Sequence, residues 1–236
     1  MHESVATALY RGYERKVNGI DMNRIYQRLG RLPNKRAAWL RGALKGLKAI
    51  PGMVVFEPQV TGQGRHASAR TILVSLEKET SGRSGWYASG MTLSARDFSM
   101  DTFDLPILVT HHLVQRTMQR LNVESPVAAI RSLQPAIFAA LWLGEPHADS
   151  SVLLPAFGGA VVTVQDRVDP WSWALVTFVD AAKLTDKQHQ QLEFWYGKAH
   201  QKLVDWVDSE LAKPPAERDP QIAGLEQQAQ AVYASA

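Results

Sequence analysis

The densest polar chemistry in the chain lies in the stretch THHLVQRTMQR, residues 110–120. Two histidines, two glutamines and two arginines occur there directly after an apolar run. At about 100° per residue, one arc of a helix over this stretch is apolar apart from one threonine, and the opposite arc is entirely polar. We therefore expect an amphipathic helix with Thr110 as its N-cap and its end near Asn122.

Three side chains of the polar arc form one stripe, because His112, Arg116 and Arg120 are spaced i, i+4 and i+8. A histidine can act as general acid or base near neutral pH, and arginines can hold a phosphate and stabilise its transition-state charge. No acidic residue on this helix offsets the two arginines. Either acids from elsewhere in the fold or an anionic ligand must therefore pair with them. The pattern fits metal-independent cleavage of RNA, and it also fits a solvated helix face.

The nine residues HLVQRTMQR, 112–120, resemble the HAxxRxxxR helix of the BECR-fold ribonuclease toxins, the RelE-like and colicin-type group. The resemblance extends over residues 104–184 and implies a His/Arg helix followed by an antiparallel sheet. It also implies metal-independent endonucleolytic RNA cleavage and a neutralising protein partner. On this resemblance His112 matches the motif histidine, Arg116 and Arg120 match the arginines, and Thr177 matches the hydroxyl residue of a late strand.

The N-terminal part of the chain is strongly basic. Residues 1–48 hold eleven basic and three acidic side chains, a net charge of +8, whereas residues 180–236 net −3. This uneven charge distribution favours an anionic partner for the N-terminal part, or docking between the two ends of the chain. Solvated basic helices remain the alternative. The candidate nucleic-acid-binding residues are Arg36, Arg41, Lys45 and Lys48 on one helix and Arg65 and Arg70 near a glycine-rich stretch.

Hydrophobic periodicity and turn residues predict an α+β fold. N-terminal helices come first, then the His/Arg helix packed on a small antiparallel sheet, then a long C-terminal helix opened by the capping box TDKQ. Predicted helices cover 3–17, 22–30, 34–50, 110–121, 124–144 (interrupted at Pro135) and 185–212; predicted strands cover 69–79, 86–98, 103–109, two strands in 151–167, and 171–180. We expect a basic helical region at 1–60, an α+β core domain at 61–183 and a helical region at 184–236.

Several classes of protein are disfavoured by composition. The chain of 236 residues has no cysteine, so disulfides and thiolate chemistry are absent, which fits a cytoplasmic protein. No apolar run reaches the roughly 20 residues that cross a bilayer. The seven histidines show no metal-ligand spacing, and phosphate-cradling loops are missing, so no metal and no cofactor are predicted.

Two hypotheses follow. The first is a metal-independent endoribonuclease-like toxin or effector domain, in which His112 is the general acid or base and the two arginines hold the phosphate. The alternative is a non-enzymatic accessory factor of a phage, plasmid or mobile element that binds nucleic acid or protein. In either case RNA or another anionic molecule is the expected partner. Under the alternative, the tryptophan-rich C-terminal helix offers a seam for a homo-oligomer.

Overall fold

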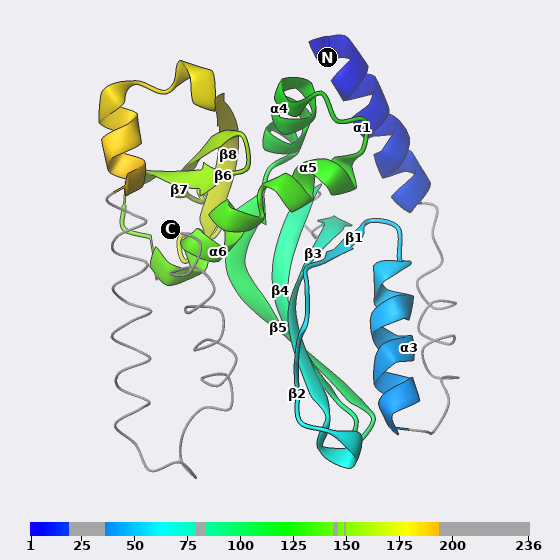
Figure 1. The fold of residues 1–236 in the computed structure, drawn as a ribbon. Coiled ribbons are helices and arrows are strands. Elements are labelled where there is room, and N and C mark those ends of the chain that lie inside the picture. Colours follow the sequence, from blue (N-terminus) through cyan, green and yellow to red (C-terminus); the bar gives the residue numbers. More distant parts are fainter. Residues whose placement is uncertain (19–35, 79–83, 144–145, 149, 194–236) are drawn as a thin grey trace, which may run out of the picture. The chain divides into compact units, whose positions relative to one another are not determined.

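The computed structural model describes residues 1–18, 36–78, 84–143, 146–148 and 150–193 (Figure 1). Met1–His189 form one compact unit, and the residues from Gln190 onward belong to a second. The predicted helix at 22–30 lies outside the described residues. The predicted C-terminal helix is described only as far as residue 193.

One mixed sheet organises the first unit. Its strands lie in the order β1-β3-β4-β5-β8-β7-β6, and β2 pairs with β3. Neighbours are antiparallel except β5 and β8, which run parallel. The sheet is therefore larger than the small antiparallel sheet that the sequence predicted. Its strands are β1 (Met53–Val55), β2 (Gln59–Thr61), β3 (Ser68–Lys78), β4 (Ser84–Ser94), β5 (Ser99–Val109), β6 (Ser151–Ala156), β7 (Gly159–Gln165) and β8 (Trp173–Asp180).

The helices largely follow the predicted ranges. They are α1 (Glu3–Asn18), α3 (Arg36–Lys48), α4 (His111–Leu121), α5 (Pro126–Ser132) and α6 (Gln134–Leu143), with short 3₁₀ turns η1 (Gly64–His66) and η2 (Ala181–Lys183). The predicted helix at 124–144 is interrupted near Pro135, as the proline ring requires. Pro135 is the second residue of α6, where its missing N–H costs no helical hydrogen bond, and the two helices separate at Leu133.

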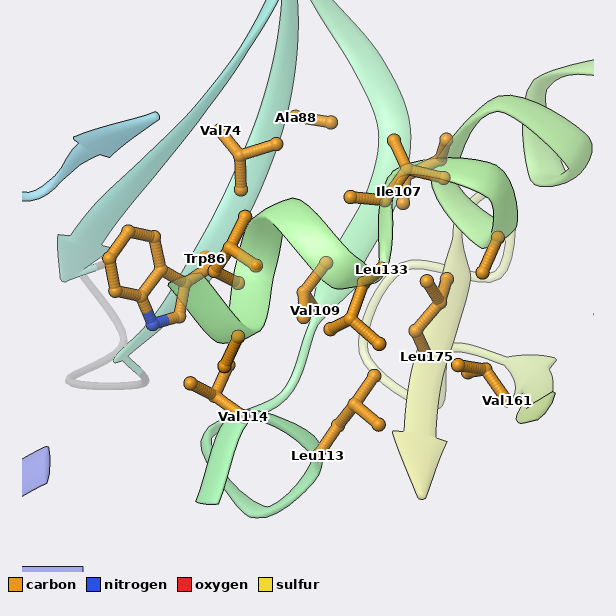
Figure 2. Packing of buried hydrophobic residues seen from close by; sticks show 14 of the residues in the cluster. Val74, Trp86, Ala88, Ile107, Val109, Leu113, Val114, Leu133, Val161 and Leu175 are labelled. Carbon is orange, nitrogen blue, oxygen red and sulfur yellow. The ribbon is translucent and has the colours of Figure 1, made fainter. Parts of the chain in front are cut away.

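Helices cover both faces of the sheet. Successive residues of a strand point to opposite faces, and Val54 belongs to one buried cluster while Val55 belongs to another. The first cluster joins the sheet to α1, α4, α5 and α6, and the second joins it to α3. Figure 2 shows part of the first cluster, with Leu113 on the Leu175 side of α4 and Val114 on the Trp86 side.

The predicted boundary between residues 60 and 61 falls inside β2. Both β1 and β2 pair with β3, and α1 and α3 pack on the same sheet as the later elements. The basic N-terminal residues are thus part of the Met1–His189 unit and not a separate helical arm.

Helix α1 is anchored by two tyrosines around Trp86. The indole Nε1 of Trp86 donates a hydrogen bond to the hydroxyl of Tyr10 at 3.0 Å, and both side chains are buried. The ring of Tyr13 stacks on Trp86, and its hydroxyl accepts from the backbone N–H of Gly52 at 2.9 Å. Burial raises the pKa of both tyrosine hydroxyls. The anchor therefore depends on neutral tyrosines.

We expect Tyr10→Phe to lower the free energy of unfolding by about 1–3 kcal/mol, because the buried Trp86 N–H loses its acceptor. Urea titration at pH 7 measures this loss.

A raised pKa also makes stability fall as the pH rises above about 10, where the tyrosines of the unfolded chain ionise. The variant should show a shallower decline in that range, and an unchanged decline would contradict the anchoring role of Tyr10.

Candidate functional site

Helix α4 is attached to the sheet through its N-cap residue. Strand β5 leads into α4 and pairs with β8 through only three residue pairs, from Ile107 with Trp173 to Val109 with Leu175. The next residue, Thr110, donates from its backbone N–H to the carbonyl of Leu175 at 3.1 Å. Its hydroxyl also lies 3.0 Å from that carbonyl, so the start of α4 is bound to the middle of β8.

The two ends of α4 are capped as the sequence predicts. The Thr110 hydroxyl accepts a hydrogen bond from the backbone N–H of Leu113 at 3.2 Å, which makes it a true N-cap. Asn122 ends the helix in the left-handed conformation with φ of 53°. The orientation of the polar arc is thereby determined by local sequence and by the contact with β8.

Helix α1 covers one stripe of the polar arc. The ring of Tyr10 meets that of His111 edge-on with centroids 5.1 Å apart, and Glu14 lies 3.9 Å from His111 Nδ1. One turn on, the Thr7 hydroxyl donates to the side chain of Gln115 at 3.4 Å. His111 and Gln115 thus serve the interface between the two helices.

The neighbouring stripe of His112, Arg116 and Arg120 stays at least partly accessible to solvent. His112 is exposed, and the two arginines are half-buried. Arg116 donates to the side-chain oxygen of Gln119 at 2.7 Å and lies 3.9 Å from Glu3 of α1. The acid that the helix itself lacks is therefore supplied by another element, but at a distance and at an exposed position that leave the ion pair weak.

Thr177 lies on the strand next to α4, on the face away from its core. On β7, Val162 pairs with Thr177 and Thr163 pairs with Leu175, so Val176 is an extra residue of β8, as in a β-bulge. The bulge shifts the alternation, and Phe178 joins Leu175 in the main core cluster. Thr177 therefore points to the other face, and no hydrogen bond links it to α4 side chains within the described part of the chain.

The predicted nucleic-acid-binding residues come from adjacent elements. Arg36 begins α3, and Arg41, Lys45 and Lys48 are exposed farther along it. Arg65 and Arg70 are also exposed, on η1 and β3. The residues between η1 and β3 share the second buried cluster with α3, through Ala67 and Leu40. The structure thus brings the two predicted basic groups onto one part of the unit.

Cavities lie elsewhere among the described residues of the first unit, and three of them are lined as follows. The largest of the three, about 640 Å³, is a mainly apolar groove between α1 and the start of α5. A second, about 430 Å³, lies against β4, β5 and the β7–β8 connection and includes Asp104, Asp166 and Trp171. A third, about 350 Å³, includes Lys48, Arg131 and Phe157. His112, Arg116 and Arg120 line none of these three.

Arg131 and Phe157, which line the third cavity, were not predicted from the sequence. Arg131 is on a short helix whose apolar residues drew attention to the core, and Phe157 precedes two glycines in a predicted turn. A large aromatic side chain at a turn between strands was the one available signal, because such turns favour small and polar residues.

The described residues also bear on two other features, a metal site and a membrane-spanning helix. They contain no group of three or more histidine, aspartate or glutamate side chains arranged to hold a metal ion. None of the helices in this part of the chain is long and apolar enough to cross a membrane. Comparison of the chain with protein-family models, with curated proteins and with solved structures gave no match.

Thr110→Val tests how far the site depends on its helix cap. The substitution removes the N-cap and the hydroxyl contact with Leu175, so we expect the free energy of unfolding to fall by about 1–2 kcal/mol. Thr102→Val on the exposed half of β5 is the matched control and should change stability by less than about 0.5 kcal/mol. Chemical denaturation measures both, and equal effects would contradict the assignment.

Proposed function

We propose that this protein is a metal-independent endoribonuclease in which the open stripe of α4 contacts the RNA backbone. The single observation that carries the proposal is the division of the α4 polar arc. Helix α1 packs on His111 and Gln115, whereas His112 is exposed and Arg116 and Arg120 stay partly accessible. An open stripe suits a polymer that lies across the surface, and it offers little to a small molecule that must be enclosed.

The proposed reaction needs no metal-bound water. His112 takes the proton of a ribose 2′-OH, and the 2′ oxygen attacks the adjacent phosphorus. The bond to the 5′ oxygen breaks, that oxygen takes a proton from water, and a 2′,3′-cyclic phosphate remains. The hydroxide left from the water then removes the proton from His112. Arg116 and Arg120 stabilise the charge that develops on the phosphate oxygens.

The proposal gives Thr177 no step in the reaction. Its hydroxyl points to the face of the sheet away from the α4 core, as the pairing of β7 with β8 and the burial of Phe178 indicate. The resemblance to the BECR-fold toxins supports the roles of His112, Arg116 and Arg120, and a neutralising protein partner is part of the same proposal. A cytoplasmic location is proposed with it, because RNA is the substrate.

Binding without cleavage is the second candidate function. Arg116 already has protein partners in Gln119 and Glu3, and the stripe lies outside the three cavities described above. These observations favour a surface that holds RNA, or another anionic partner, through α3 and η1. A homo-oligomer would present several such surfaces at once.

His112→Ala decides between the two functions. If the protein is an endoribonuclease, we expect the variant to cleave a single-stranded RNA at least about 100-fold more slowly, the usual contribution of a general base. EDTA should leave the wild-type rate unchanged. An oligonucleotide with deoxyribose at every position should not be cleaved at all, because the 2′-OH is the nucleophile. Gel analysis of end-labelled substrates measures the cleavage rates.

His147→Ala is the matched control, because His147 is exposed and lies outside α4. It should cleave at the wild-type rate. Purified wild-type protein that shifts RNA but does not cleave it would refute the enzymatic proposal and support binding alone. Circular dichroism of each variant checks that loss of cleavage does not come from unfolding.

The basic surface of α3 makes a separate prediction about salt. Each phosphate contact on a single strand contributes about 0.7 to the slope of log Kobs against log salt concentration. Lys45→Gln should therefore weaken RNA binding and reduce this slope by roughly that amount. Lys187→Gln, another exposed lysine, is the control and should leave the slope unchanged. Fluorescence anisotropy at several salt concentrations measures the slopes, and equal slopes would exclude α3 from the interface.

A further inference from the structure

The cavity of about 350 Å³ lies where four separate parts of the chain meet. The C-terminal end of α3, strand β1, the junction of α5 with α6, and the turn between β6 and β7 all contribute side chains to it. Figure 1 shows β1 joined to α3 on one side and beneath α5 on the other. None of these segments belongs to the α4 stripe, so the cavity is distinct from the candidate cleavage site.

The polar lining of the cavity is suited to an anion. Lys48 and Arg131 supply positive charge, and Ser132 and Gln134 supply a hydroxyl and an amide. Glu57 also borders the cavity and lies 3.6 Å from the ammonium of Lys48. Because the Glu57 side chain is 86% exposed and that of Lys48 40% exposed, the ion pair is in contact with water and leaves Lys48 able to bind a phosphate.

Phe157 is the aromatic side chain at the rim of this cavity. It occupies the turn between β6 and β7 beside Gly158, whose φ is +81°. Phe157 is 60% exposed, so its burial contributes little to folding. Its backbone N–H donates to the carbonyl of Ser132 at 3.0 Å, which holds the base of the side chain against α5.

From this arrangement we infer a nucleotide-binding subsite for single-stranded RNA, in which Phe157 stacks on a base while Lys48 and Arg131 bind the flanking phosphates. An exposed aromatic ring beside basic side chains is the combination by which proteins hold unpaired nucleotides. Gln134 faces the same cavity and supplies a donor and an acceptor for the edge of the base. The inference rests on RNA being the ligand, as in the proposed function.

The subsite lies between the two surfaces already assigned to RNA. Lys48 is the last residue of the basic helix α3. On the other side, a Cβ atom added to Gly158 would lie 2.8 Å from the side chain of Leu121 in α4. The turn that carries Phe157 therefore adjoins the Arg120 end of the stripe. His112 is eight residues farther along α4, roughly 12 Å at 1.5 Å per residue. A chain of several nucleotides reaches both points, whereas a dinucleotide does not.

Phe157→Ala in the His112→Ala background tests the subsite without cleavage. The ligand is a single-stranded 12-mer RNA with a fluorescent end label, and a second series carries 2-aminopurine, which reports base stacking. We expect the affinity for the 12-mer to fall roughly 5- to 150-fold, the range for loss of one base–aromatic stack. Arg131→Ala should weaken binding and lower its salt dependence, and Glu57→Gln should strengthen binding, because a repelling carboxylate is removed.

Each variant has a matched control. Phe103→Ala removes an equally exposed phenylalanine, 57% against 60%, from β5, which does not border this cavity. Arg167→Ala removes an exposed arginine beyond the opposite end of β7. Both controls should bind the 12-mer with wild-type affinity. The 2-aminopurine signal should change on binding to the protein with Phe157 and not to Phe157→Ala.

The outcomes separate this inference from the proposed function. If Phe157→Ala binds the 12-mer like its Phe103→Ala control, the subsite is refuted whether or not the protein cleaves RNA. If Phe157→Ala weakens binding but His112→Ala does not reduce cleavage, the subsite stands and the catalytic proposal fails. If Phe157→Ala alters self-association in sedimentation and leaves RNA affinity unchanged, the cavity belongs to a protein interface and the inference is overturned. In a cleaving enzyme, Phe157→Ala should slow cleavage of the 12-mer and leave cleavage of a dinucleotide unchanged.

Discussion

The arrangement of this unit depends on the short parallel seam between β5 and β8. Three residue pairs join strands β1 to β5 on one side of the seam to strands β6 to β8 on the other. Thr110 extends the connection by donating a hydrogen bond to the carbonyl of Leu175. The same threonine caps α4, so one side chain sets both the end of the strand pairing and the start of the helix. A parallel pair needs a long crossover, and here α4, α5, α6 and the β6–β7 hairpin provide it. The position of His112 and the turn that carries Phe157 both follow from this connection.

Packing of α1 decides which polar side chains of α4 remain accessible. Tyr10 and Ala6 are buried in the main core, so α1 is held by apolar contacts as well as by its polar contacts with α4. His111 lies between the two helices with Glu14 and the Tyr10 ring beside it, and its buried Nε2 has no hydrogen-bond partner among the described residues. On the next stripe His112 faces water, and Arg116 has Gln119 and Glu3 as partners. The polar arc, uniform in the sequence, is thus divided by its environment into a structural and an accessible half.

Local sequence signals predicted the elements of this fold well. The caps at Thr110 and Asn122, the interruption near Pro135 and the turn at Gly158 each depend on the conformational preferences of a few adjacent residues. The reciprocal hydrogen bonds of Thr185 with Gln188 likewise confirm the predicted capping box.

How distant parts of the chain pack together was harder to predict from one sequence. The predicted boundary between residues 60 and 61 falls inside a strand because β1 and β2 are only three residues long, too short to show a period of two. The face of Thr177 depends on one extra residue at Val176, and alternation in the sequence gives no sign of that bulge. The cavity at Phe157 is formed by residues from position 48 to position 157, so no local pattern indicates it.

An open site and a distant stacking residue are physically consistent with each other. Contacts on an exposed stripe are screened by water and salt, so His112 and the arginines gain little binding energy from a single phosphate. Binding energy from remote parts of a substrate can instead position the reacting group and lower the barrier. A base held at Phe157, with its backbone along α3 and α4, would restrict the RNA without enclosing it. The same physics accounts for binding without cleavage, since a surface that holds RNA through remote contacts needs no reactive histidine. The chemistry of His112 therefore has to be tested apart from the affinity.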